Sequence, residues 1–329
     1  MQPTIRSIDL GYGNIKFVTG LESDGTPICR LFPSLAPIAT ANSLESGPFQ
    51  SRDTVRVQVN DATYEVGPDV RLALKGYSAS DRTKSFVETD AYLARFRGAL
   101  AYMGVSRIDL LVLGLPVEDY EENKHLLAGL AKGEHPLPDG KKVFIDKVMV
   151  FAQPMGGFYN FLQAHSKEHQ IRNRYTLVID PGYVTLDWVF ADGFNPVNAR
   201  SGSYPGGVSK ILEEIGNALK DKNLPRIDEG LRTNDYTIHG KKVDLRPYLE
   251  NAKPAIEEAV VAMANSVGDT AEISRIVLVG GGAFLYQPAI EKRFKGIEVL
   301  RDKGSVFSNV RGFQFIGEYL YNNGLKGVA

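Results

Sequence analysis

The order of apolar and polar positions along the chain predicts a series of elements that recurs in both halves. In the first half we expect three strands, followed by a helix, a strand, a helix, a strand and a helix. The predicted ranges are 4–9, 15–19, 27–32, 91–103, 108–113, a helix opened by Pro116, 143–151 and 155–163. Such an alternation of strands and helices predicts an α/β fold.

The second half repeats this order, with three strands first and helices alternating with strands afterwards. The predicted elements are strands at 175–180, 185–191 and 196–203, a helix after Gly206-Gly207, a long helix opened by Pro254, a strand at 276–279, a helix, a strand at 297–301 and a last helix ending near Asn323-Gly324. Two polar stretches, at about 33–89 and 223–249, are predicted to be insertions. The first is predicted to contain a small hairpin at 55–66, and the second to be irregular except for a hairpin turn at His239-Gly240.

One acidic turn occurs twice in the chain. When Ile8–Val18 is aligned with Ile179–Val189, isoleucine, aspartate, glycine, tyrosine and the final valine coincide. Each segment joins two strand-like runs, which predicts a β-hairpin with a carboxylate beside its turn. Lys16 in the first segment corresponds to Asp187 in the second. Carboxylates hold Mg²⁺ through water, and turn amides with a hydroxyl group cradle phosphate oxygens, so the repeat predicts a clamp for a Mg–nucleotide.

Composition and charge narrow the function classes. The 329 residues suffice for two domains, and 43% hydrophobic with 23% charged residues is typical of a globular protein. The formal net charge of −1 offers no electrostatic basis for binding nucleic acid directly. Cys29 is the only cysteine, which excludes a disulfide within the chain. With no signal-peptide pattern and no apolar run long enough for a bilayer, we expect a cytoplasmic protein that does not contact membranes.

Other motifs for phosphate and metal binding are absent or poorly placed. No G-x-x-x-x-G-K-[ST] pattern occurs, and Gly11-x-Gly13 lacks the third glycine of a dinucleotide-binding turn. The run from His165 to His169 matches H-x-x-E-H, but its polar surroundings disfavour a zinc site. The glycines at 280–282 follow an apolar strand, which is also the pattern of a close-packed turn between a strand and a helix.

Two β-β-β-α-β-α units with an insertion in each resemble the actin/chaperone/sugar-kinase ATPase superfamily. The motifs that carry the resemblance, in chain order, are Asp9-x-Gly11-x-Gly13-x-x-Lys16, Gln153-Pro154-Met155-Gly156-Gly157, Asp180-x-Gly182-x-x-Thr185-x-Asp187, Val277–Ala283 and Asn309-Val310-Arg311-Gly312. The likeness is greatest to the plasmid-segregation actins of the ParM/StbA type. It implies a duplicated ribonuclease-H-like fold with two domains around a nucleotide cleft, domain I at 1–157 plus 312–329 and domain II at 158–311.

The resemblance also implies roles for individual residues. Asp9 and Asp180 would hold hydrated Mg²⁺, and Gln153 would orient the attacking water. The residues implied in catalysis are Gln153, Asp180 and Asp187. Those implied in binding ATP, with GTP as the alternative, are Asp9, Gly11, Tyr12, Gly13, Asn14, Lys16, Gly182, Tyr183, Thr185, Gly206, Gly207, Gly280, Gly281 and Gly282. Tyr12 and Tyr183 depart from the small residues common in relatives, so their rings either cover the phosphate site or pack outside it.

The function implied is that of an actin-like ATPase that polymerises with ATP and hydrolyses it slowly. Its expected partners are further copies of the chain and a DNA-binding adaptor protein that links the filament to plasmid DNA. One alternative is a small-molecule kinase of the same fold, for which the two insertions look small as a substrate domain. The other is a non-polymerising adaptor of the FtsA/PilM kind. ATP-dependent light scattering distinguishes these functions.

Overall fold

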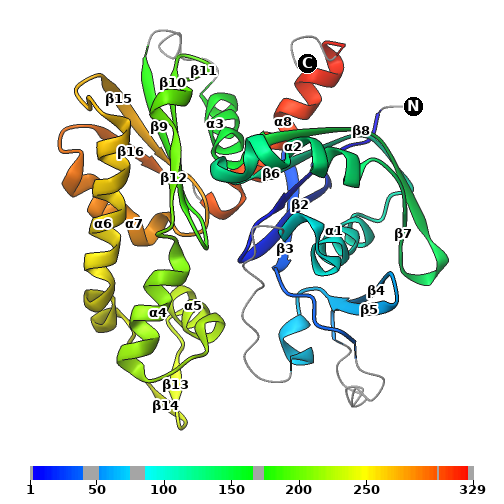
Figure 1. Cartoon of the computed structure of the whole chain (residues 1–329), viewed down its shortest axis with the longest axis horizontal. Coiled ribbons are helices and arrows are strands. Elements are labelled where there is room, and N and C mark those ends of the chain that lie inside the picture. Colours follow the sequence, from blue (N-terminus) through cyan, green and yellow to red (C-terminus); the bar gives the residue numbers. More distant parts are fainter. Residues whose placement is uncertain (1–2, 40–51, 75–85, 166–173, 302–303, 325–329) are drawn as a thin grey trace. The chain divides into compact units, whose positions relative to one another are not determined.

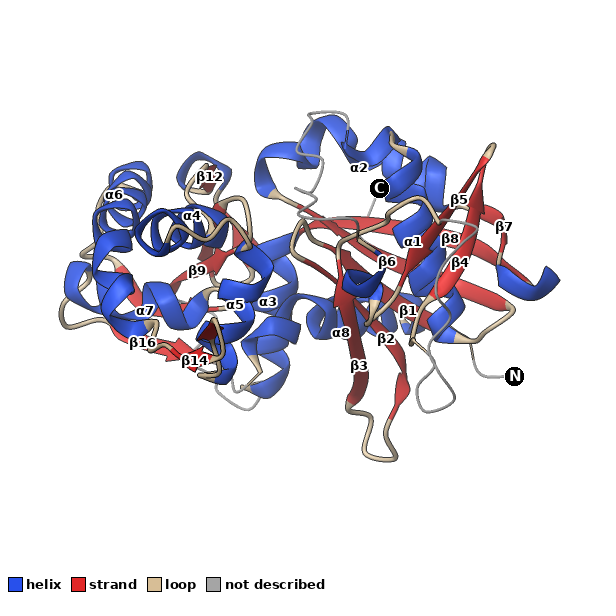
Figure 2. Ribbon diagram, turned by 90° about the horizontal axis from the view of Figure 1, so that it is seen from below, coloured by secondary structure: helices blue, strands red, loops and turns tan. Residues whose placement is uncertain are grey.

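The chain forms two compact units, one made of residues 1–167 with 307–329 and the other of 168–306. The computed structural model describes residues 3–39, 52–74, 86–165, 174–301 and 304–324 (Figure 1). His169, the second histidine of the H-x-x-E-H pattern, lies outside these residues. In both units, helices flank a central sheet (Figure 2). No helix in the described ranges is long and apolar enough to cross a membrane.

The first unit is built on a six-stranded sheet with the order β3-β2-β1-β6-β8-β7. Its strands are β1 Ile5–Leu10, β2 Asn14–Leu21, β3 Pro27–Pro33, β6 Arg107–Leu115, β7 Gly133–Pro136 and β8 Lys142–Ala152. Strands β1, β6 and β8 run parallel, and the others pair antiparallel with their neighbours. The strands predicted in this half are confirmed, whereas β7 was not expected, because its four residues show no apolar alternation.

Helices cover both faces of this sheet. They are α1 Asp90–Met103, α2 Val117–Ala131, α3 Gln153–Ala164 and α8 Ser308–Asn322. In β6, Leu110 and Val112 pack with Phe313 of α8, while Leu111 and Leu113 belong to the core that includes α1. This explains why β6 is an almost continuous apolar run. The insertion hairpin is confirmed as β4 Val55–Val59 and β5 Ala62–Val66.

Helices α3 and α8 cross in backbone contact. A Cβ atom added to Gly312 would lie 1.7 Å from the carbonyl oxygen of Gly156, so only glycine fits at the crossing. Both helices lie wholly within the first unit. The domain boundaries implied by the resemblance, after residue 157 and before residue 312, fall inside these helices, because residues 153–157 and 309–312 resemble the connecting segments of that superfamily.

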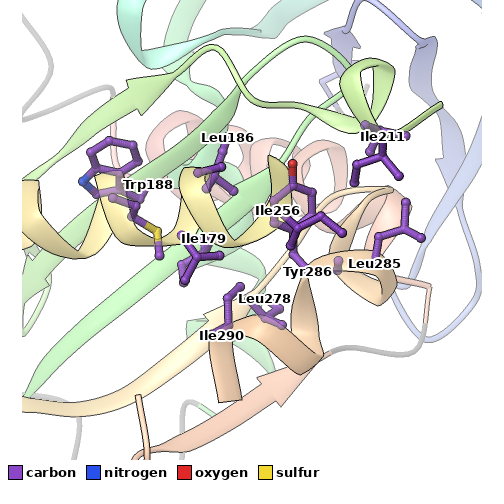
Figure 3. Packing of buried hydrophobic residues seen from close by; sticks show 14 of the residues in the cluster. Ile179, Leu186, Trp188, Ile211, Ile256, Leu278, Leu285, Tyr286 and Ile290 are labelled. Atoms are coloured by element: carbon purple, nitrogen blue, oxygen red, sulfur yellow. The ribbon is translucent and has the colours of Figure 1, made fainter. Parts of the chain in front are cut away.

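The second unit repeats this architecture. Its sheet has the order β11-β10-β9-β15-β16, and β12 also pairs with β10. The strands are β9 Tyr175–Pro181, β10 Leu186–Asp192, β11 Asn195–Pro196, β12 Gly202–Tyr204, β15 Ile273–Leu278 and β16 Glu298–Arg301. The helices are α4 Val208–Leu219, α5 Leu224–Thr233, α6 Leu249–Val267 and α7 Ala283–Arg293. A separate hairpin comprises β13 Thr237–Ile238 and β14 Lys241–Lys242. Figure 3 shows Ile179, Leu186 and Leu278 of the sheet packed with residues of α4, α6 and α7.

The two sheets correspond strand for strand around their centres. In the first, β1 lies between antiparallel β2 and parallel β6; in the second, β9 lies between antiparallel β10 and parallel β15. The predicted duplicated α/β fold is therefore confirmed. Short 3-10 helices complete the described structure at Val70–Ala73, Phe86–Glu88, Pro138–Gly140, Asn198–Arg200, Arg246–Tyr248 and Ser305–Phe307.

Three predictions in the second unit were wrong. The strand expected at 196–203 is split into β11 and β12, because Pro196 cannot donate to a continued ladder and a 3-10 turn follows. The stretch 223–249 is not irregular, since it contains α5, although its hairpin turn is confirmed. Helix α6 begins before Pro254 rather than at it. Pro254 is exposed and removes only one intrahelical hydrogen bond, to the carbonyl of Glu250.

Candidate functional site

The first acidic hairpin brings three predicted site residues together. Asp9, near the end of β1, lies opposite Lys16 of β2 and is fully buried. Lys16 Nζ donates to Asp9 Oδ2 at 2.8 Å, and Gln153 Nε2 donates to Oδ1 at 2.7 Å. The Asp9 carboxylate is thus held by a cation and an amide, one on each oxygen. Because a carboxylate offers about four lone-pair sites, Asp9 can still accept from metal-bound water, so it fits the predicted hydrated Mg²⁺.

Gly114 of β6 makes room for Gln153. It pairs with Asp9 across the parallel strands. A Cβ atom on Gly114 would lie 3.2 Å from Cγ of Gln153 and 2.5 Å from the ring of Phe313. Gly114 was not predicted from the sequence to be part of the nucleotide site. The available signal was a glycine inside an otherwise apolar strand, which often marks a close approach of another group.

The turn of the first hairpin, residues 11–13, is held from outside. The amide of Ser34 donates to the carbonyl oxygen of Gly13 at 3.0 Å. The ring of Tyr12 lies on the ring of Phe86, with 4.5 Å between centroids, and packs against the core of the first unit. The Tyr12 ring therefore packs against protein. At Gly11, an added Cβ atom would lie 3.1 Å from the carbonyl oxygen of Asn14, the first residue of β2.

The second acidic hairpin places two buried carboxylates opposite each other. Asp180 of β9 pairs with Asp187 of β10, and their exposed fractions are 4% and 1%. Thr185 Oγ1 donates to Asp187 Oδ2 at 2.6 Å, and the amide of Gly182 closes the turn onto the carbonyl oxygen of Thr185 at 2.8 Å. Like charges facing each other across a strand pair are destabilising. A hydrated divalent cation would offset this repulsion, so these residues also fit Mg²⁺.

The start of α4 holds the second turn in shape. The amides of Gly207, Val208 and Ser209 donate to the carbonyl oxygens of residues 184, 182 and 183 at 2.9, 2.9 and 2.8 Å. These first amides of the helix are therefore satisfied by the turn rather than left for an anion. An added Cβ atom on Gly207 would lie 2.4 Å from the carbonyl carbon of Val184, so glycine allows the approach. Gly206 accepts a hydrogen bond from the hydroxyl of Tyr286.

The three glycines after β15 differ in their surroundings. Gly280 has a φ of 73°, and an added Cβ atom would lie 1.9 Å from Asp180 Oδ1. A Cβ atom on Gly282 would lie 2.6 Å from the carbonyl oxygen of Pro181. Around Gly281 the nearest atoms would be at 3.6 and 3.8 Å, which is ordinary contact. Gly280 is thus required by its packing on Asp180, and Gly282 by its packing on Pro181 and Val208, whereas Gly281 is not required by packing.

Arg232 of α5 lies beside this glycine segment and was missed by the sequence analysis. Its Nη1 donates to the carbonyl oxygen of Gly281 at 3.2 Å, and its guanidinium lies 5.4 Å from the ring centroid of Phe284. The region was predicted to be irregular, so no sequence signal connected Arg232 with residues 280–282. Among the described residues, no three His, Cys, Asp or Glu side chains converge as a metal-binding group.

Comparisons with known proteins agree with this fold. Residues 7–156 match the family model of the N-terminal domain of actin-like proteins, and residues 178–292 match that of the C-terminal domain of the archaeal MreB-like actin homologue. No curated protein sequence matches the chain.

Several solved structures share the fold. The apo psk41 ParM protein is 19% identical, with a TM-score of 0.71 over 98% of this chain and 99% of that one. The archaeal actin homologue Ta0583, in complex with ADP, is 18% identical, with a TM-score of 0.72 over 96% and 99%. The ParM of a 15-stranded filament from Clostridium botulinum is 20% identical, with a TM-score of 0.76 over 97% and 100%.

Proposed function

The chain belongs to the actin-like proteins, and from this membership we propose that it binds a Mg–nucleotide, hydrolyses its terminal phosphate slowly and assembles into filaments. One observation carries the proposal. A buried aspartate occupies the same strand position in both units, and each faces a charged residue across its hairpin: Asp9 faces Lys16, and Asp180 faces Asp187. A structural turn has no need to keep buried charge in both copies, whereas a phosphate site does.

We assign roles to the side chains from their contacts. Lys16 neutralises charge on the phosphates, and Asp9 and Asp180 accept hydrogen bonds from metal-bound water. Bound Mg²⁺ supplies charge stabilisation on the phosphate oxygens. One N–H of Gln153 Nε2 donates to Asp9, and Oε1, the acceptor of the same amide, can accept a hydrogen bond from the attacking water. Since an amide takes no proton at neutral pH, this assignment implies slow turnover.

The proposed partners are further copies of the chain and a DNA-binding adaptor protein. A similar structure is that of a ParM filament, which supports self-assembly as the proposal. The formal net charge of −1 suits a filament that reaches plasmid DNA through an adaptor rather than by its own surface. We propose ATP as the nucleotide, with GTP as the alternative.

Light scattering with simultaneous phosphate release tests the proposal. Addition of Mg-ATP or Mg-GTP should raise the scattering, and phosphate release should follow assembly. Asp180→Asn preserves shape and removes the charge, so this variant should lose Mg-dependent hydrolysis while keeping a cooperative melting transition. Wild-type hydrolysis by the folded variant would overturn the assignment of the hairpins. Phosphorylation of a sugar or carboxylic acid without assembly would instead favour the kinase.

A further inference from the structure

The turn at residues 11–13 is anchored at two consecutive positions by parts of the first unit outside the hairpin. The ring of Tyr12 stacks on the ring of Phe86, and the carbonyl oxygen of Gly13 accepts from the amide of Ser34. Phe86 is itself fixed, because it meets the ring of Tyr92 edge-on at 5.1 Å and is 5% exposed. Neither anchor comes from the strands of the hairpin.

One buried side chain joins both anchors. The guanidinium of Arg95, on α1, lies over the ring of Phe86 at 4.5 Å from its centroid. Its Nη1 also donates to the carbonyl oxygen of Ser34 at 3.2 Å. The residue is only 2% exposed. The contacts therefore run from Tyr12 through Phe86 to Arg95, and from Arg95 through Ser34 back to Gly13.

We propose that Arg95 is a positioning residue for this turn, and that nucleotide affinity depends on it through Phe86 and Ser34. The dependence of nucleotide affinity on Arg95 rests on the proposed function, whereas the positioning of the turn does not. A planar guanidinium can stack on a ring and donate in its own plane at the same time, which neither lysine nor an apolar side chain can do. Burying a charge is costly, and the contacts with Phe86 and Ser34 offset part of that cost.

The test compares Arg95→Met with a matched variant on the same helix. Methionine fills much of the space of arginine but removes both contacts. Arg97→Met is the control, because Arg97 also lies on α1 and its Nη1 also donates to a carbonyl oxygen, that of Gln58 at 2.9 Å. Unlike Arg95, Arg97 contacts neither Phe86 nor Ser34. Phe86→Leu removes the ring that Tyr12, Arg95 and Tyr92 contact but leaves the hydrogen bond from Arg95 to Ser34, and it serves as a second variant if Arg95→Met does not fold.

Amide hydrogen exchange without nucleotide is the first measurement. Arg95→Met and Phe86→Leu should exchange faster at residues 10–18 while residues 180–187 keep wild-type exchange, and Arg97→Met should match wild type at both. Titration with Mg-ADP is the second. The Kd should rise by about tenfold to a hundredfold in the two anchor variants, which corresponds to a loss of about 1.4 to 2.8 kcal/mol of binding free energy.

The two measurements test the positioning of the turn and the link to nucleotide affinity separately. Unchanged exchange at residues 10–18 in both anchor variants would overturn the positioning role, as would faster exchange spread evenly over the whole unit. Faster local exchange with an unchanged Kd would overturn the link to nucleotide affinity. If the wild-type protein binds no nucleotide, the proposed function fails, and the exchange data still decide the positioning of the turn.

Discussion

At the scale of single residues, the glycines after β15 separate binding from stability. Gly281→Val adds a side chain where the nearest atoms lie at 3.6 Å or more from Cβ, so we expect a change in melting temperature of only a few degrees. If the nucleotide approaches the backbone there, its affinity should fall at least about tenfold. Calorimetric titration with ADP checks the affinity, and a thermal melt checks stability.

Gly280→Ala provides the matched comparison for this prediction. Its φ of 73° disfavours alanine by about 1 kcal/mol, and the added Cβ atom would displace the Asp180 carboxylate. This variant should lose both stability and binding. Wild-type affinity in Gly281→Val would mean that the nucleotide does not approach the backbone at Gly281.

The residues of the two hairpins could be predicted because the signal is local and occurs twice. Their long-range partners could not be predicted in the same way. The bond between Gln153 and Asp9 joins residues 144 positions apart, and the contact of Arg95 with Ser34 spans 61. Such pairs depend on which face of a helix meets which end of a strand, and a spacing pattern leaves that choice open.

At the scale of elements, the short strand β7 contains a buried histidine whose charge state couples stability to pH. His135 is 4% exposed, and its Nε2 lies 2.9 Å from the carbonyl oxygen of Ala131, so this nitrogen carries the proton. Burial lowers the pKa of His135, and the nearby Arg97 lowers it further. Below its ordinary pKa of about 6.5, the unfolded chain therefore binds a proton that the folded chain resists. Stability should fall as the pH decreases through this region.

Urea unfolding between pH 7.5 and 5.5 checks this expectation. His135→Gln keeps a donor for the Ala131 carbonyl and does not titrate. The free energy of unfolding of the wild type should fall relative to that of the variant by at most about 1.4 kcal/mol per pH unit. A difference that stays constant over this range would contradict the prediction.

Helices and strands were predicted correctly where burial imposes a regular pattern of apolar residues. They were missed where a capping side chain or a side-chain contact sets the ends of the element. The apolar strands β6 and β9 were expected because both faces are covered. Helix α5 was missed because it is largely polar, and the Asn223 side chain opens it by accepting from the Arg226 amide at 3.2 Å. Strands β11 and β12 are separated by the turn that contains Arg200. The guanidinium of Arg200 donates to the carbonyl oxygens of Val267, the last residue of α6, and of Asp269, just beyond it.

At the scale of the whole molecule, duplication explains why the fold was easier to predict than the site. The two sheets share the order of five strands, β3-β2-β1-β6-β8 and β11-β10-β9-β15-β16, so an error in one half can be checked against the other. The charge arrangement is not repeated, since Lys16 faces Asp9 in one hairpin and Asp187 faces Asp180 in the other. The two hairpins are thus built alike but differ in charge: under the proposed function the carboxylates of both hold a hydrated cation, and only the first adds a lysine for the phosphates.

The final prediction connects Gln153 with the lifetime of a filament. Gln153→Ala removes the amide that donates to Asp9 and the oxygen assigned to orient water. An interaction that matures mainly in the transition state affects rate more than binding, so hydrolysis should slow by about tenfold to a thousandfold while nucleotide affinity changes little. If hydrolysis triggers disassembly, the variant should assemble with ATP and persist longer, as followed by scattering with phosphate release. Gln163→Ala, at an exposed position of the same helix, should behave as wild type. Loss of assembly together with nucleotide binding would make Gln153 a structural support of Asp9, and unchanged phosphate release would move the water-orienting role to Asp187.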